Sequence, residues 1–286
     1  AQENLSYQQP PKSILDLALS ERAPSVSMDS KKQFLLLSYR NTYKNLAELS
    51  QQEMRLAGLR INPVTNITSA LTYINNLKLR KVSDSTEVQV KGLPSNALIS
   101  NLSWSPNEKK IAFTNTTLKG VELWVIDVPT YQAKKITNDN LNANMGSPFE
   151  WFKDSENLLI RVLPKNRPAL LDASKDLPTG AIISNADGSV SQNRTYADLL
   201  KNRNDELNFE NVISSELHKI NLKGQSSLFK KSDMYVGESF SPDGKYLMIS
   251  TIQKPFSYVV PLNRFPSKTI VTDLSGKLIK VVNEVP

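Results

Sequence analysis

The sequence contains no cysteine, and this absence excludes several kinds of chemistry at once. A disulfide framework, a thiolate zinc site, an iron–sulfur cluster and a catalytic thiol all require cysteine sulfur. Histidine is almost absent as well, because His218 is the only one among 286 residues. The chain cannot supply by itself the two histidines of an H-E-x-x-H zinc motif, and we expect neither a metal site nor a cofactor.

Glycine is scarce too, with ten in the chain, and no two glycines stand two, four or five residues apart. That spacing excludes the G-x-G-x-x-G dinucleotide loop, the G-x-S-x-G nucleophile elbow and the P-loop. The best candidate for a calcium-binding loop, at residues 185–188, has Ile183 and Arg194 where acidic ligands are required. The sequence therefore carries no complete catalytic signature.

Basic residues exceed acidic ones by 35 to 28, which gives a net charge of +7. The densest basic runs, at residues 78–81 and 134–135, are short, and stacking aromatics are not interleaved with them. A single-strand nucleic-acid groove needs both features, so we expect a solvated basic surface and no nucleic-acid partner. No apolar run approaches the ~18 residues of a membrane span.

The first residues, 1–4, include no methionine, no basic segment and no apolar segment. A start at the small residue Ala1 is what signal peptidase would leave, and a chain without cysteine is compatible with export from a bacterium. We therefore expect an exported protein, periplasmic or extracellular, whose signal peptide has been removed.

The dominant pattern along the chain is a bulky apolar residue, a polar turn and then an apolar run that begins six or seven residues later. It occurs four times, beginning at Met28, Trp104, Trp151 and Phe240. In the last copy the turn reads Ser-Pro-Asp-Gly-Lys at residues 241–245. Proline presets one turn dihedral, glycine accepts a positive φ and aspartate bonds the turn backbone, so each segment predicts a β-hairpin.

Two copies continue into further strand-like segments. Residues 121–127 and 133–137 follow the second copy, and residues 257–260, 268–273 and 278–282 follow the fourth. Four antiparallel strands in about 40–50 residues are typical of a β-propeller blade. The sequence therefore predicts an all-β fold, a propeller of about four four-stranded blades that is part of a larger propeller.

The bulky residues that begin the four copies, here called the anchor residues, are 76, 47 and 89 residues apart. Only the middle interval has the length of one blade without an insertion. The first long interval predicts an amphipathic helix over residues 46–57 that ends at Gly58. The second predicts a polar insertion with a short helical pattern at 196–200. The predicted organisation is an N-terminal arm (1–23) and blades at approximately 24–94, 95–144, 145–231 and 232–286.

The amino-acid sequences of several segments resemble the N-terminal region of the prolyl oligopeptidase family of serine peptidases, and most closely its glutamyl endopeptidase branch. The segments that carry the resemblance are residues 7–11, 14–16, 46–49, 55–61, 102–105, 196–201, 254–261 and 264–266. The Arg-Leu-Ala-Gly-Leu-Arg stretch at 55–60 and the Pro-Phe-Ser-Tyr stretch at 255–258 are more specific than the blade turns.

This resemblance implies a secreted serine endopeptidase in which a propeller gates or positions peptide substrates. The catalytic Ser-Asp-His triad would lie in a C-terminal α/β-hydrolase domain of the same polypeptide, which is absent here because the sequence stops at Pro286. No residue of this chain can therefore be assigned a catalytic role from the resemblance, and we expect the chain alone to be inactive. His218 is interpreted as an ordinary strand residue.

Two arginines, Arg60 and Arg264, lie beside the family-like segments. An enzyme that cleaves after glutamate needs a cation near the substrate carboxylate, and a guanidinium binds a carboxylate through two hydrogen bonds. These residues are the candidate substrate contacts, and a structural ion pair or solvent exposure is the alternative for each.

Two other interpretations of the whole chain remain open at this point. It could be a stand-alone, non-catalytic propeller that binds peptides or proteins. Its four blades could also close into a complete small propeller, since propellers contain from about four to eight blades.

Overall fold

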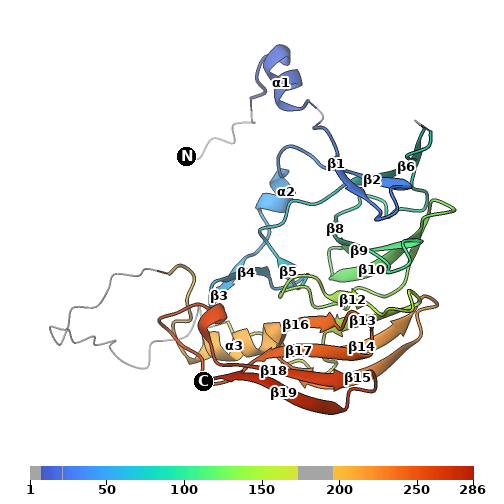
Figure 1. The fold of residues 1–286 in the computed structure, drawn as a ribbon. Helices are drawn as coiled ribbons and strands as arrows, with labels where there is room; N and C mark the ends of the chain where they lie inside the picture. The colour runs from blue at the N-terminus through green and yellow to red at the C-terminus, as the bar shows by residue number, and fades with distance from the viewer. Residues whose placement is uncertain (1–7, 21, 85, 173–195) are drawn as a thin grey trace, which may run out of the picture.

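Four four-stranded antiparallel sheets form the framework of the computed structural model, which describes residues 8–20, 22–84, 86–172 and 196–286. Each sheet contains strands from one continuous stretch of chain, as expected for a propeller blade. This confirms the predicted all-β blade architecture with small helical insertions. Figure 1 shows the sheets in succession from β1 to β19, with the first and the last at opposite ends of an open arc.

The four blades follow one another along the chain. The first consists of β1 (Ser25–Met28), β2 (Phe34–Tyr39), β6 (Asn76–Lys81) and β7 (Glu87–Gln89). The second consists of β8 (Ile99–Trp104), β9 (Lys110–Thr116), β10 (Val121–Asp127) and β11 (Gln132–Lys135). The third consists of β12 (Phe149–Trp151), β13 (Asn157–Val162), β14 (Ser215–Asn221) and β15 (Ser226–Asp233). The fourth consists of β16 (Tyr235–Phe240), β17 (Tyr246–Ile252), β18 (Ser267–Asp273) and β19 (Leu278–Val285).

The other elements lie outside the blades. A small three-stranded sheet contains β3 (Met54–Leu56), β4 (Leu59–Asn62) and β5 (Ile67–Thr68). The helices are α1 (Lys12–Ala18), which buries no residue, α2 (Leu46–Leu49), α3 (Arg203–Ile213) and the 3-10 turn η1 (Leu262–Arg264).

A buried apolar cluster lies between each pair of consecutive blades, because a blade has two faces and must cover both. The central members are Leu36, Leu79 and Phe113 between the first two blades, Leu123 and Leu158 between the second and third, and Leu217, Leu247 and Ile249 between the last two. These clusters form the hydrophobic core of the arc.

The anchor residues found in the sequence make the same contact in successive blades. The indole Nε1 of Trp104 donates to Ser27 Oγ at 3.0 Å, and that of Trp151 donates to the backbone oxygen of Ser103 at 3.2 Å. In both cases the acceptor is the residue just before the previous anchor. Met28, the first anchor, is 48% exposed, and no earlier blade is described against it.

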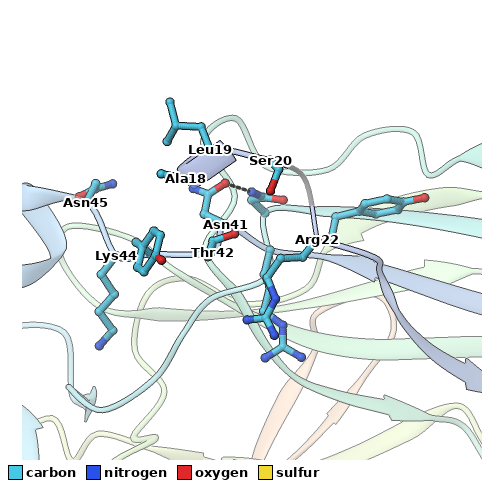
Figure 2. A pocket seen from close by; sticks show the side chains of 12 residues that line it. Ala18, Leu19, Ser20, Arg22, Asn41, Thr42, Lys44 and Asn45 are labelled. Atoms are coloured by element: carbon cyan, nitrogen blue, oxygen red, sulfur yellow. Dashed lines mark hydrogen bonds between the residues drawn. The ribbon is translucent and has the colours of Figure 1, made fainter. Parts of the chain in front are cut away.

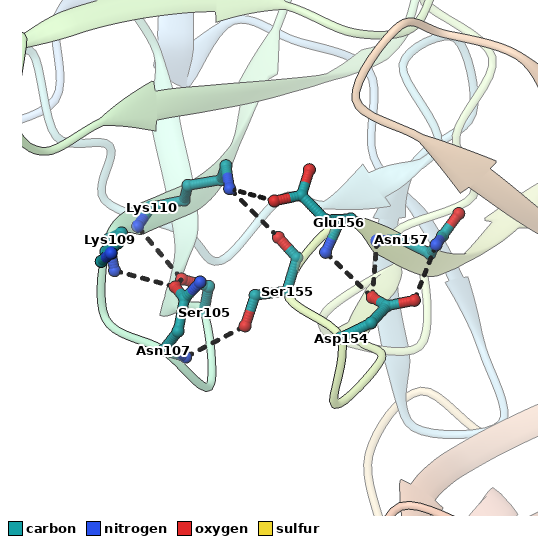
Figure 3. A network of polar contacts seen from close by, with 8 residues as sticks. All are labelled: Ser105, Asn107, Lys109, Lys110, Asp154, Ser155, Glu156 and Asn157. Carbon is teal, nitrogen blue, oxygen red and sulfur yellow. Dashed lines mark hydrogen bonds and ion pairs between the residues drawn. The ribbon is translucent and has the colours of Figure 1, made fainter.

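The turns that join the first two strands of each blade also contact one another. Between the first and second blades, Glu108 Oε1 accepts the backbone N–H of Ser30 at 2.6 Å. Figure 3 shows the next pair, in which the Lys110 ammonium lies 2.6 Å from a Glu156 carboxylate oxygen and the N–H of Asn107 donates to Ser155 Oγ at 3.0 Å. Between the last two blades, Lys153 Nζ donates to the Pro242 oxygen at 2.7 Å. The turns therefore line one rim of the arc as a continuous series of contacts.

A buried ion pair joins the third and fourth blades. The Arg161 guanidinium on β13 contacts both carboxylate oxygens of Glu238 on β16, at distances of 2.5 to 3.1 Å. The two side chains are only 5% and 6% exposed. Arg161 Nη1 also donates to the Met145 oxygen at 3.0 Å, so the cation is held on more than one side.

The helix predicted over residues 46–57 is wrong after its first turn. Only Leu46–Leu49 is helical, and Asn45 caps its start by accepting from the Glu48 N–H. Residues 54–56 form strand β3 instead, because the turn at Ala57 and Gly58, with φ values of 52° and 86°, reverses the chain into β4. The glycine marks a hairpin rather than a helix end.

Two smaller predictions are also wrong. Residues 196–200 contain no helix, and the helix of this insertion is α3, which begins after Asn202 accepts the N–H of Asp205 at 2.9 Å. Residues 257–260 form no strand, and the third strand of the last blade is β18 alone. In both places side chains pack on residues from other blades, which local sequence patterns do not encode.

We expect Arg161→Met to lower the free energy of unfolding by about 3–5 kcal/mol, because it leaves the Glu238 carboxylate buried without its partner. Urea denaturation monitored by circular dichroism measures the change. The double variant Arg161→Met/Glu238→Leu should recover most of the loss, since it removes both charges.

Lys268→Met is the matched control for this experiment. Lys268 pairs with Glu284 at 3.3 Å, and the side chains are 36% and 64% exposed, so its removal should cost less than about 1 kcal/mol. Equal costs for Arg161→Met and the control would show that the buried pair is not a major support of the fold.

Candidate functional site

The insertions of three different blades meet in one apolar cluster, here called the insertion cluster. The segment between β2 and β6 supplies β3 and β4, the segment between β13 and β14 supplies α3, and the segment between β17 and β18 supplies residues 253–266. The buried members are Leu56, Ala57, Ile61, Leu200, Phe209, Val212, Ile213, Met234, Ile252 and Phe265. The most specific family-like segments of the sequence are therefore brought together in space.

The backbone joins the three insertions closely at the β3–β4 turn. The Leu262 N–H donates to the Ala57 oxygen at 2.9 Å, and the Gly58 N–H donates to the Asp198 oxygen at 2.8 Å. A Cβ atom at position 58 would lie 3.0 Å from the Cβ of Pro261. Gly58 is thus required both by its positive φ and by this close approach.

Three phenylalanines form the centre of the insertion cluster. The ring of Phe209 on α3 meets the edges or faces of Phe256 and Phe265 at centroid distances of 5.0 and 5.6 Å. Phe256 and Phe265 are stacked at 5.5 Å. Because Phe209 is fully buried, it fixes the position of α3 on the loop of the fourth blade.

The C-terminal end of α3 is tied to the linker between the second and third blades. The side-chain amides of Asn142 and Asn144 donate to the Val212 oxygen at 2.9 and 2.8 Å. A helix end leaves its last carbonyl groups without intrahelical partners, and the two asparagines satisfy this one.

Arg60 lies at the surface of the insertion cluster, on β4. Its Nε lies 2.7 Å from a carboxylate oxygen of Asp198, and Arg55 Nη1 lies 3.6 Å from the other. The hydrogen bond that Arg60 donates to the Asp198 carboxylate raises the pKa of Arg60 above its ordinary value. The side chain of Arg60 is 47% exposed, which leaves part of the guanidinium open to solvent.

Arg264, at the end of η1, is exposed and lies over the ring of Tyr196, with 5.9 Å between the guanidinium carbon and the ring centroid. Tyr196 and Asp198 belong to the same short loop. The structure therefore connects both sequence-predicted arginines, Arg60 and Arg264, to one segment, although no direct contact joins them. Sequence reasoning did not identify Asp198 and Tyr196 as their partners, although the Tyr-Ala-Asp stretch was among the family-like segments.

The single histidine is on β14, in the third blade. One ring nitrogen, Nε2, lies 2.9 Å from Glu216 Oε2, and the other, Nδ1, lies 3.1 Å from Ser226 Oγ. These are the residue types of a serine hydrolase triad, but Ser226 is the first residue of an extended strand. A nucleophilic serine of that class lies in a sharp strained turn between a strand and a helix, so the arrangement lacks the geometry of an active site.

A pocket of about 400 Å³ lies away from the insertion cluster, between the end of α1 and the loop after β2 (Figure 2). Two of its cationic side chains already have partners: Arg40 donates to Ser25 Oγ and Lys44 to the Ser69 oxygen, each at 2.7 Å. These bonds hold the loop in place.

Within the described ranges, no group of three carboxylate or histidine side chains is arranged to hold a metal ion. None of the helices in the described part of the chain combines the length and the apolar character of a membrane span.

Comparison with known proteins gives two plant relatives that match almost the whole chain. A probable chloroplastic glutamyl endopeptidase of Oryza sativa subsp. japonica is 31% identical over 99% of this chain, and its counterpart in Arabidopsis thaliana is 30% identical over 98%. The chain spans only 31% and 30% of the length of these relatives. No protein-family model matches the chain.

The solved structures that match this chain are more distant in sequence. The acylaminoacyl peptidase of Pyrococcus horikoshii matches 94% of this chain and 33% of its own, with 16% identity and a TM-score of 0.49. The β-propeller domain of the Trilobed protease of Pyrococcus furiosus matches 92% of this chain and 59% of its own, with 14% identity and a TM-score of 0.42.

We expect Phe209→Ala to lower the free energy of unfolding by about 3–5 kcal/mol, because it opens a cavity at the centre of the insertion cluster. Chemical denaturation measures this. Leu207→Ala on the same helix is the control, since Leu207 is 39% exposed and should lose far less. A loss at Phe209 no larger than the control would mean that the insertions are held by other contacts.

We also expect the purified chain, residues 1–286, to remain unlabelled by a fluorophosphonate probe and to cleave no glutamate-containing peptide. The physical reason is that Ser226 is not positioned as an activated nucleophile. In-gel fluorescence, with an active serine hydrolase as positive control, measures the labelling. Robust labelling that is lost in Ser226→Ala would show that the Glu216–His218–Ser226 group is a working site.

Proposed function

Because this chain is related over nearly its whole length to the glutamyl endopeptidase branch of the prolyl oligopeptidase family, we propose that it is the propeller segment that admits and positions peptide substrates for a serine peptidase domain. The observation that carries the proposal is the match of 99% of this chain to 31% of a glutamyl endopeptidase. In this proposal the α/β-hydrolase domain with the catalytic triad belongs to the same polypeptide.

The exposed faces of the end blades support a place within a larger propeller. On the first blade Val26 and Met28 are 59% and 48% exposed, and on the fourth blade Tyr246 and Met248 are 44% and 43% exposed. Interior blades cover the corresponding faces with a neighbour. Additional blades on both sides would bury these apolar side chains, and no closure between the first and fourth blades is needed.

Within this function, Arg60 and Arg264 are the proposed contacts for the carboxylate of a substrate glutamate. Support comes from their exposure and from their connection to the loop that carries Tyr196 and Asp198. Asp198 uses one edge of the Arg60 guanidinium and leaves other N–H donors available, since a guanidinium has five. Arg264 is held by a ring rather than by a carboxylate, so an incoming anion does not have to displace an acid.

Export, to the periplasm or outside the cell, remains part of the proposal. The absence of cysteine is compatible with it, whereas the names of the two plant relatives place those proteins in the chloroplast. Cell fractionation of the source organism with an antibody against this chain tests the location directly.

The complete polypeptide encoded by the gene tests the function. We expect it to contain a G-x-S-x-G serine and to cleave after glutamate. In that polypeptide Arg60→Gln and Arg264→Gln should each reduce kcat/KM for a glutamate substrate about tenfold or more, mainly through KM, because a charge-assisted hydrogen bond to substrate is lost.

Circular dichroism melting controls for folding in this experiment, and both exposed variants should melt close to the parent protein. A peptide with glutamine in place of the glutamate should respond little to either variant. Unchanged KM values would assign the arginines to structure alone. A polypeptide with no hydrolase domain would overturn the proposed function and favour a non-catalytic binding propeller.

A further inference from the structure

A second arginine site lies in a pocket beside α3, and none of the residues discussed above as substrate contacts belongs to it. The pocket has a volume of about 780 Å³, within the range of small-molecule and peptide sites. One wall is residues 164–171, the segment that follows β13, and the other is the exposed face of α3 with the start of β14. Pro164, Pro168, Ala169, Leu171 and Leu207 give it an apolar lining.

Two asparagines of α3 hold the first wall in place. Asn208 accepts the N–H of Leu171 and donates to its oxygen, both at 2.8 Å, as a neighbouring strand would. Asn211 donates to the Pro168 oxygen at 2.7 Å. The pocket is therefore a fixed part of the fold, with its walls bonded together at two points.

Arg167 lines this pocket and is held with one donor group unused. Its Nε donates to Asn211 Oδ1 at 2.9 Å, and its Nη1 donates to Asn66 Oδ1. Nη2 is buried and has no hydrogen-bond partner among the described residues. Both of its partners are neutral amides, and burial lowers the pKa of Arg167 below its ordinary value.

The carboxylates that line the pocket among the described residues have other partners. The pocket also contains Glu210 and Glu216, but Glu210 pairs with Lys254 at 2.6 Å and Glu216 contacts the ring of His218 at 2.9 Å. Among the described residues no carboxylate forms an ion pair with Arg167. Arg167 is partly buried, and removing a charge from water is costly unless it is paired, so an anion that pairs with Arg167 in the pocket offsets part of that cost.

We propose that the pocket between residues 164–171 and α3 binds a carboxylate carried by a peptide, with Arg167 as the charged contact and the prolines and leucines holding the adjoining apolar side chains. A guanidinium matches a planar carboxylate in geometry, because it can donate two parallel hydrogen bonds to the two carboxylate oxygens. The carboxylate can come from an acidic side chain or from a peptide C-terminus, since the chemistry of the two is the same.

Fluorescence anisotropy with the isolated chain tests this binding and does not depend on a hydrolase domain. Three labelled peptides distinguish the sources: one with glutamate between leucines and an amidated end, the same peptide with glutamine, and the glutamine peptide with a free C-terminal carboxylate. We expect at least one carboxylate peptide to bind about tenfold or more tightly than the amidated glutamine peptide.

Arg167→Gln should abolish that preference, and Ala169→Trp should weaken binding of all three peptides by filling the pocket from its rim. Arg203→Gln is the matched control, because Arg203 is on the same helix, outside the pocket lining, and 69% exposed. It should bind like the parent chain. If Arg167→Gln proves unfolded by circular dichroism, Ala169→Trp decides the question.

Three results would overturn the proposal. They are equal binding of the carboxylate and amide peptides, no measurable binding of any peptide, and carboxylate binding as tight as in the parent chain in a folded Arg167→Gln or Ala169→Trp chain. None of these results bears on whether the complete polypeptide is a peptidase, so the two proposals can fail separately.

Discussion

The contact between consecutive blades is the constraint on which the rest of this structure depends. A four-stranded blade has two apolar faces and can bury neither alone, so each must pack on its neighbours. The indole of Trp104 reaches Ser27 and that of Trp151 reaches Ser103, one blade back in each case. This hydrogen bond recurs at the first two interfaces, and at the third Phe240 packs on Phe152 with 4.6 Å between the ring centroids.

The position of the long insertions follows from blade topology. All three insertions follow the second strand of their blade. In an antiparallel blade the connection after the second strand lies at the opposite end of the strands from the turn after the first strand. The insertions of the first, third and fourth blades are therefore delivered to one rim, opposite the turns that link Lys110 with Glu156. Both arginine sites, the one on the insertion cluster and the one beside α3, depend on this convergence.

The sequence was sufficient for the blades because a hairpin is a local structure. The turn residues and the apolar runs around Trp104 and Phe240 predict their strands directly. It was insufficient where distant contacts decide the conformation. Residues 54–57 have apolar spacing suited to a helix, but the bond from Leu262 to Ala57 and the approach of Pro261 to Gly58 favour a hairpin. The burial of Phe209 against Phe256 and Phe265, and the unused donor of Arg167, depend on residues far apart in the chain.

The bond between Ala57 and Leu262 has a consequence for how the molecule unfolds. A pure repeat protein behaves as a one-dimensional array in which each unit senses only its immediate neighbours, so that units can fray from either end. Here the insertion cluster links the first blade to the third and fourth without passing through the second. This link should make the end blades unfold together in one cooperative transition, whereas blades joined only face to face could unfold separately.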